Sequence, residues 1–127
     1  MKRILTSLAA VVALGAAATP VWAHHSGNAE FDTTKTAVIS GTFTGLDEIN
    51  PHSRWQMVAK GPDGQPQNWV FQGTSPNRIR AVGIKVKDDL KPGTVYTFYY
   101  CPSWNGTNIG LLLAMDINGR KVTFLAI

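Results

Sequence analysis

The fold is decided by residues 36–60, which read TAVISGTFTGLDEINPHSRWQMVAK. The first half of this stretch is rich in β-branched and apolar residues, and the second half alternates polar and apolar side chains, as half-buried strands do. Asn50-Pro51-His52 separates the two halves. Proline donates no backbone hydrogen bond and restricts the preceding residue to extended or turn geometry. The stretch therefore predicts a strand over 36–47, a corner at the proline, and a second strand over 52–60.

Beyond this stretch, turn signals alternate with short apolar runs. Gly61-Pro62-Asp63-Gly64 predicts a turn, and Asn118-Gly119 predicts a tight hairpin. Ser75 followed by Pro76 is typical of a helix start and Gly83 of a helix end, so one short helix is expected at 76–82 and no other after the leader. Strands are further expected at 67–72, 94–101, 109–117 and 120–125, and residues 26–35 are expected to form an irregular arm anchored by Phe31.

The order of these elements predicts an all-β fold. Three strands of a meander precede the helix, and two or three more strands follow it. An OB fold is a small, curved five-stranded barrel, and its helix lies between strands 3 and 4. An immunoglobulin-like sandwich would have about seven strands and no internal helix. The sequence therefore favours an OB-like barrel, with another small closed β-barrel as the alternative.

The first 23 residues are expected to be a signal peptide. Lys2 and Arg3 precede an apolar run, 4–17, that is too short for a comfortable membrane span. Val21 and Ala23 occupy the −3 and −1 positions of a cleavage site, which leaves a single domain over residues 24–127. An uncleaved anchor and a cut after Ala18 are the alternatives. The protein is thus expected in the periplasm or outside the cell, with no membrane contact once the leader is removed.

Composition argues against several classes of partner. Removal of the leader leaves ten basic and eight acidic residues, a formal charge of +2 without any basic run. So small a charge favours neither nucleic acid nor a membrane surface. Cys101 is the only cysteine, so no disulfide can form within the chain. A buried, inert thiol is its expected state, with a metal ligand or an intermolecular disulfide as alternatives.

Several short motifs are spread over the chain, and in order they are Ala23-His24-His25-Ser26, Phe31-Asp32, Asn50-Pro51-His52, Trp69, Ser75-Pro76-Asn77, Gly83 and Leu90-Lys91-Pro92-Gly93. With these motifs the sequence resembles the DUF6152 family, small exported bacterial proteins without an assigned activity. The resemblance implies export and supplies no catalytic residue. The chain departs from the family at Ile84, where an aromatic residue is common, and Cys101 and Trp104 look particular to this sequence.

All three histidines of the chain stand at two points, His24 and His25 at the expected new N-terminus and His52 at the proline corner. An N-terminal histidine offers its α-amine and its ring Nδ1, and a second imidazole completes the planar three-nitrogen set that Cu(II) prefers. This histidine brace forms only after the leader is removed. We expect a metal site at His24, His52 and His25, with copper preferred over zinc, and Asp32 or Glu30 as an axial oxygen ligand. In the alternative, the first two histidines form a solvated tail and His52 caps a turn.

Signals of an enzyme are few. The sequence has no nucleophile elbow, no phosphate-binding glycine loop and no His-Glu-x-x-His motif. Asp47-Glu48 and Asp88-Asp89 are paired by sequence, but neighbours on a strand face opposite ways and loop carboxylates are usually solvated. A sugar- or base-stacking surface is one interpretation of the aromatic residues, but their alternate spacing favours core packing. These residues are Trp55, Trp69, Tyr96, Phe98, Tyr100 and Trp104.

The function expected from the sequence is therefore copper carriage or homeostasis in the periplasm, without catalysis. Two alternatives stay open. One is an OB-like module that binds a saccharide, a peptide or a protein partner without a metal. The other is a copper enzyme that uses the same histidines for redox chemistry.

Overall fold

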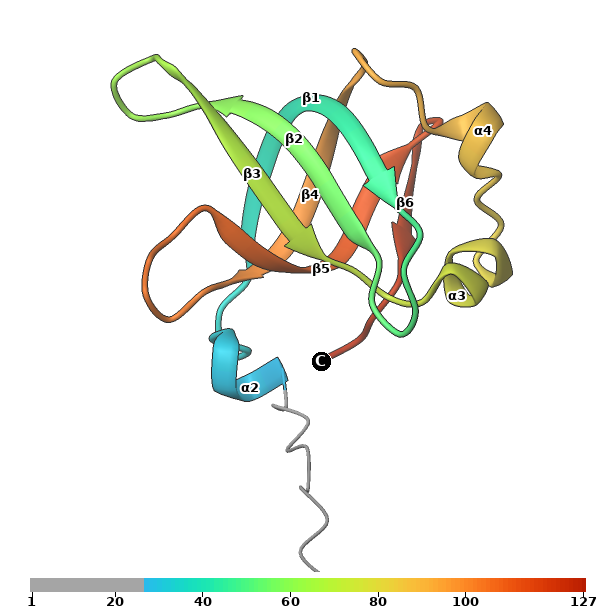
Figure 1. The fold of residues 1–127 in the computed structure, drawn as a ribbon, viewed down its shortest axis with the longest axis horizontal. Coiled ribbons are helices and arrows are strands. Elements are labelled where there is room, and N and C mark those ends of the chain that lie inside the picture. The colour runs from blue at the N-terminus through green and yellow to red at the C-terminus, as the bar shows by residue number, and fades with distance from the viewer. Residues whose placement is uncertain (1–26) are drawn as a thin grey trace, which may run out of the picture.

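The computed structural model describes residues 27–127. Figure 1 shows a strongly curved sheet with short helices at its margins. The elements in chain order are α2 (Gly27–Glu30), β1 (Ala37–Asp47), β2 (Arg54–Lys60), β3 (Pro66–Gln72), α3 (Pro76–Ala81), α4 (Val86–Asp89), β4 (Val95–Pro102), β5 (Ile109–Ile117) and β6 (Arg120–Thr123).

The sheet closes on itself. Its strand order is β3-β2-β1-β4-β5-β6, and β3 also pairs with β5 in parallel, through Val70 with Ile109 and Phe71 with Gly110. The other strand pairs are antiparallel, including the predicted meander of β1, β2 and β3. The five strands β1–β5 thus form a closed barrel with the helix between strands 3 and 4, which confirms the OB-like prediction. β6 adds a short hairpin strand beyond the barrel.

The long first strand produces the curvature. The first half of β1 pairs with β4 and its second half pairs with β2, with an irregularity in register between Phe43 and Gly45. A bulge of this kind bends a strand and increases its twist. At the bend, a Cβ on Gly41 would lie 2.7 Å from the carbonyl oxygen of Val58, so β2 can cross this closely only over a glycine.

The helix between β3 and β4 begins and ends as its sequence predicts. The Ser75 hydroxyl accepts a hydrogen bond from the backbone N–H of Arg78, and Pro76 is the first helical residue. Gly83 follows with φ of +88°, a conformation that side chains disfavour. Ile79 is fully buried, so the helix packs on the core. The predicted range 76–82 is confirmed to within one residue.

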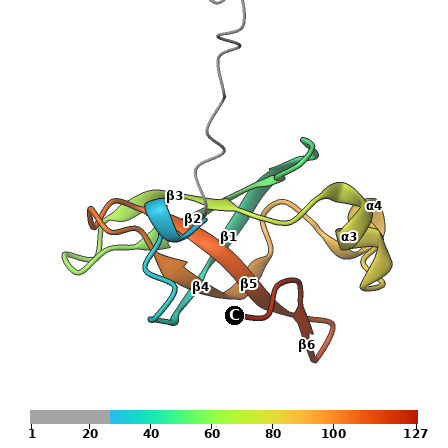
Figure 2. The ribbon, with the colours of Figure 1, turned by 90° about the horizontal axis from the view of Figure 1, so that it is seen from below.

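The prediction that this helix stands alone is wrong, because α2 and α4 are also helical. Each is a single turn of four residues, too short for a periodic pattern. The carboxylate of Asp89 accepts a hydrogen bond from the backbone N–H of Lys85 at 2.7 Å, and this contact closes α4. Figure 2 places α3 and α4 together at one side of the barrel, away from α2.

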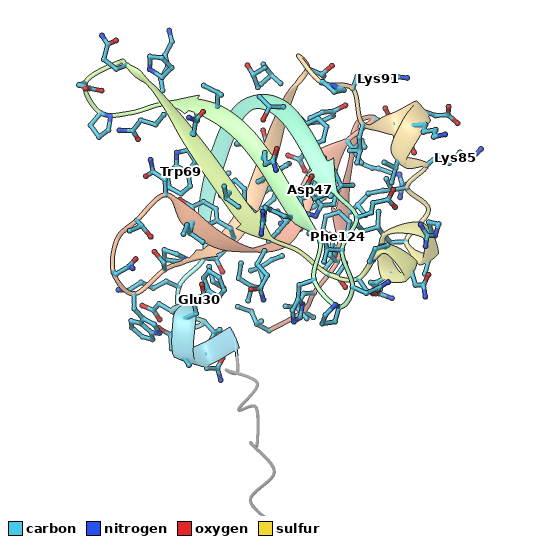
Figure 3. The ribbon with its side chains drawn as sticks, viewed as in Figure 1. Glu30, Asp47, Trp69, Lys85, Lys91 and Phe124 are labelled. Carbon is cyan, nitrogen blue, oxygen red and sulfur yellow. The ribbon has the colours of Figure 1, made fainter. Side chains whose placement is uncertain are left out.

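Aromatic rings fill the barrel. Phe98 makes edge-to-face contacts with Trp55 and Phe71, with centroid distances of 5.9 and 5.1 Å. Aromatic pairs favour this geometry because the ring edge is positive and the ring face negative. Trp69 is partly buried and stacks on Phe71. Figure 3 labels Trp69 beside β3. Core packing is therefore the use of the aromatic strand residues, as predicted. For Trp104 the prediction of core packing is wrong, because 59% of this residue is exposed.

A second, smaller apolar cluster joins the arm to the outside of the barrel. Phe31 is fully buried there against Cys101, Leu111 and Leu113. Its anchoring role was predicted. No helix within residues 27–127 is long and apolar enough to cross a membrane.

Candidate functional site

His52 lies in the loop between β1 and β2, exposed to solvent directly after the cis Asn50–Pro51 bond. The next residue, Ser53, is 1% exposed and holds the loop in place. Its backbone N–H and its hydroxyl both donate to the carbonyl oxygen of Thr74, at 3.1 and 2.6 Å. The indole N–H of Trp55 donates to the Ser53 hydroxyl at 2.9 Å. The backbone next to His52 is therefore fixed to the core by hydrogen bonds, while the residue itself is exposed.

Two hollows flank His52. The larger, of about 320 Å³, lies on the outer side of β2 and β3, where Arg54, Val70 and Gln72 point away from the core. The smaller, of about 190 Å³, adjoins Leu125 near the C-terminus. Figure 1 shows α2, the β1–β2 loop and the C-terminus at the same end of the barrel. The residues around the larger hollow are Glu30, Phe31, Ile49, His52, Ser53, Arg54, Val70, Gln72 and Ile109.

Of the two carboxylates considered as axial ligands, the structure brings Glu30 to the hollow of His52. Asp32 is 3% exposed and is already bound. Its Oδ1 accepts hydrogen bonds from the Thr34 backbone N–H and hydroxyl, and its Oδ2 lies 3.1 Å from Lys35 Nζ. The hydrogen bonds from Thr34 lead the effects that lower the pKa of the Asp32 carboxyl, and Lys35 adds to them while burial opposes them. Asp32 thus stabilises the turn after Phe31.

The predicted metal ligands His24 and His25, and the predicted signal peptide, lie outside the described residues. Within residues 27–127, no group of three or more His, Cys, Asp and Glu residues is placed to hold a metal ion. Any site of the predicted kind therefore needs the residues before Gly27.

The thiol of Cys101 is fully buried in the outer apolar cluster. Burial raises its pKa, and the negative charge of Asp32 adds to the shift. A thiolate, the form that attacks and binds metals, is therefore disfavoured. The structure agrees with the expected buried and inert state.

Three carboxylates of the two pairs noted in the sequence have structural contacts. Asp47 accepts a hydrogen bond from the Gln56 amide at 2.9 Å, and Glu48 pairs with Arg80 at 3.1 Å. Asp89 closes α4 through the backbone N–H of Lys85 and accepts a hydrogen bond from Asn118. These contacts give Asp47, Glu48 and Asp89 structural roles.

Sequence reasoning missed the role of Trp104. Its indole N–H donates to the carbonyl oxygen of Asn28 at 3.0 Å, and its backbone N–H donates to the carbonyl oxygen of Glu30 at 3.2 Å. The tryptophan thus binds the backbone of α2. One signal in the sequence could have indicated this role. Trp104 follows the expected strand 94–101 and directly precedes the turn at Asn105-Gly106, where a ring is less suited to the core.

Comparison with known proteins gives a family and a fold. Residues 11–113 match the model of a family of unknown function (DUF6152). None of the curated proteins compared with the chain matches it. Among solved structures, the mitochondrial single-stranded DNA binding protein Rim1 of S. cerevisiae is similar, with a TM-score of 0.50 and 9% sequence identity over 66% of this chain and 93% of that chain. At that identity the likeness concerns the fold alone.

Proposed function

The chain belongs to the DUF6152 family, a family of unknown function, and we propose that it is an exported copper-binding protein. His24 binds the ion through its α-amine and ring Nδ1, and His52 supplies the third nitrogen. In this proposal the protein carries or buffers copper, and three of the four paired carboxylates, Asp47, Glu48 and Asp89, make structural contacts in the described fold.

One observation carries this proposal: Glu30, the last residue of α2, lines the same hollow as His52. α2 is four residues long and rises about 6 Å, since a helix rises 1.5 Å per residue. His24 precedes Gly27 by three residues, and three residues of extended chain reach at most about 10 Å. The arm is therefore long enough to return His24 to the hollow.

The donor chemistry favours copper. Amine and imidazole nitrogens follow the Irving–Williams order, which places Cu(II) above Zn(II). Three nitrogens in one plane suit the tetragonal geometry of Cu(II), and Glu30 is placed to offer a weak axial oxygen. His25 is a neighbour of the brace and contributes less. Protons compete for the same nitrogens, so copper affinity should fall as the pH is lowered.

The site requires cleavage after Ala23, because an amide nitrogen at His24 would be a poor ligand. We therefore propose that residues 1–23 are removed during export to the periplasm. The intact mass of the exported protein tests this step. A chain that begins at Ala23 would place His25 third and form a different copper motif, in which deprotonated backbone amides are ligands.

The central experiment is a Cu(II) titration of protein that begins at His24, followed by electron paramagnetic resonance. His52→Ala should weaken binding by more than the roughly 10–100-fold that loss of a supporting contact costs. One extra residue before His24 should do the same, because it converts the α-amine into an amide without changing any side chain of the site.

His25→Ala is the matched control, because it removes a histidine from the same segment and should leave affinity nearly unchanged. If the N-terminally extended protein binds Cu(II) as tightly as the native protein, with the same spectrum, the brace does not exist. Turnover of an oxidant at the loaded site would instead favour the copper enzyme.

A second candidate is a binding module without a metal. The observation that favours it is the hollow itself, because its lining combines the apolar residues Val70 and Ile109 with the charged residues Arg54 and Glu30. A saccharide or an extended peptide would suit such a surface. We do not propose nucleic acid, since single-stranded nucleic acid binds by stacking on aromatic rings. The outward residues of β2 and β3 include no aromatic residue, and they are Arg54, Gln56, Val58, Lys60, Pro66, Asn68, Val70 and Gln72.

A further inference from the structure

We infer that Asn118 is a site of covalent modification, at which its side chain closes on the backbone nitrogen of Gly119 and the product loosens α4. The inference goes beyond the proposed function and needs no bound metal. It rests on the different surroundings of two identical dipeptides, Asn105-Gly106 and Asn118-Gly119, both of which lie in the described fold. The two sites can therefore be compared within one molecule.

The modification is deamidation, and water is its only co-reactant. The backbone nitrogen of Gly119 attacks the side-chain carbonyl carbon of Asn118, so a new C–N bond forms. The attacking nitrogen gives up its proton, and the side-chain amide leaves as ammonia. Water then opens the cyclic succinimide at either carbonyl and yields aspartate or isoaspartate. Glycine favours the ring closure because it has no Cβ next to the attacking nitrogen.

The folded chain leaves Asn118-Gly119 free to react. The two residues form the loop between β5 and β6, where Ile117 pairs with Arg120. Both are exposed, with φ of 50° and 75°, as in a type I′ turn. Within residues 27–127, the turn and loop hydrogen bonds of the backbone do not use the N–H of Gly119. A Cβ at Gly119 would meet no heavy atom within 4 Å, so nothing crowds a ring at this position.

Asn105-Gly106 is also exposed, but its polar groups are bound. The N–H of Gly106 donates to the carbonyl oxygen of Ser103 at 3.3 Å. The side-chain oxygen of Asn105 accepts hydrogen bonds from the Ser103 hydroxyl and from the N–H and hydroxyl of Thr107, at 2.9, 3.2 and 2.7 Å. The space around Gly106 is as open as that around Gly119, so these bonds are the difference between the two sites. Ring closure at Asn105 must break them.

Asn118 also connects the β5–β6 hairpin to α4. Its side-chain N–H donates to Asp89 Oδ1 at 3.1 Å, and Asp89 Oδ2 accepts the hydrogen bond from the Lys85 N–H that closes α4. Deamidation replaces the amide donor by a carboxylate, which can only accept. The new negative charge stands opposite the Asp89 carboxylate, and like charges repel. The product should therefore loosen α4.

The surroundings of Asn118 add to this repulsion. A hollow of about 410 Å³ lies beside it, and the charged residues of its lining are Asp88, Asp89, Asp116 and Lys91. Before the reaction, three carboxylates and one ammonium group line the hollow, and the reaction adds another carboxylate. The modified turn thus has an excess of negative charge next to α4.

The test follows both sites in the metal-free protein during prolonged incubation in mildly alkaline buffer. Peptide mapping by mass spectrometry detects aspartate and isoaspartate at each position. They should form at least about tenfold faster at 118 than at 105, because several hydrogen bonds must break at 105. In urea the two sites should react at similar rates, since glycine follows each asparagine. Equal rates in the folded protein, or a faster reaction at 105, would overturn the assignment.

Variants test the effect on α4. Asn118→Asp reproduces the aspartate product, and hydrogen exchange should then rise in residues 85–90 and not in the β1–β4 pair. Asn118→Ala is the matched control, because it removes the donor without adding a charge, and it should raise exchange less. Adding Asp89→Asn to Asn118→Asp should restore protection, since amide and carboxylate then change places. If Asn118→Asp exchanges like the unmodified protein, the modification does not act on α4 and that part of the inference is wrong.

Discussion

At the scale of single residues, the conformation of the corner that carries His52 depends on two small residues, Ser53 and Gly73, which pack against Trp55. Ser53 places its hydroxyl between the Thr74 carbonyl oxygen and the Trp55 indole. Gly73 lies against the same two side chains and donates its backbone N–H to the carbonyl oxygen of Ser53 at 2.8 Å. The Trp55 indole thereby receives a polar partner inside an apolar core, and no room is left for a side chain at Gly73.

Gly73→Ala should destabilise the protein by about 1–3 kcal/mol, the usual cost of overpacking. Its new Cβ would lie 2.6 Å from Ser53 Oγ and closer still to Trp55 Nε1, neither of which can move freely. Urea denaturation measures the change. Gly45→Ala is the control, because its Cβ would meet only the flexible end of Gln56. Equal losses in the two variants would contradict the tight corner.

At the scale of elements, the strands and α3 could be read from the sequence because each carries a local signal. Alternation marks the strands, and Ser75-Pro76 and Gly83 mark the ends of α3. The single turns α2 and α4 could not be read, because Trp104 and Asp89 stabilise them through contacts outside any periodic pattern. The arm was expected to be irregular for the same reason.

The turn after Phe31 should make stability depend on pH. Hydrogen bonds from Thr34, with the charge of Lys35, lower the pKa of the Asp32 carboxyl in the folded protein. The resulting stability is fully present above the ordinary carboxyl pKa of about 4 and is lost as the pH falls through the lower folded-state value. Asp32→Asn should be less stable than the unmodified protein at neutral pH, and the difference should shrink below about pH 4.

Denaturant titrations at several pH values measure this difference. Asp88→Asn, which removes an exposed carboxylate from α4, controls for the change in net charge. A difference between Asp32→Asn and the unmodified protein that stays constant down to strongly acidic pH would contradict the stabilising role of the carboxylate.

At the scale of the whole molecule, the order of elements predicted the OB-like barrel, but its closure depends on contacts between distant residues. Gly110 faces Phe71 across the β3–β5 seam and packs under Tyr100. No local pattern joins residues 71 and 110. The candidate site could also be predicted only in part. Asn50-Pro51-His52 predicted the corner. That Glu30 lines the same hollow as His52 depends on the packing of the arm on the barrel, which no local pattern indicates.

Gly110→Ala should open this seam. The added Cβ would lie 2.5 Å from the Tyr100 ring and 3.0 Å from Phe71, so the rings must shift or the strands separate. We expect a loss of about 1–3 kcal/mol and faster hydrogen exchange at Val70 and Gln72. Exchange along the β1–β4 pair should change little and serves as the internal reference. Uniform acceleration over all strands would contradict a local seam.

The pairing of β3 with β5 also determines when the chain can fold during its synthesis. A nascent chain that has emerged only as far as α4 has β1 without β4 and β3 without β5, so two strand edges are open at once. Open edges recruit strands from other molecules. Pairings between distant segments also form slowly, because the intervening chain must be ordered first. Chains truncated before β5 should therefore aggregate, and productive folding should begin only when the last quarter of the polypeptide is available.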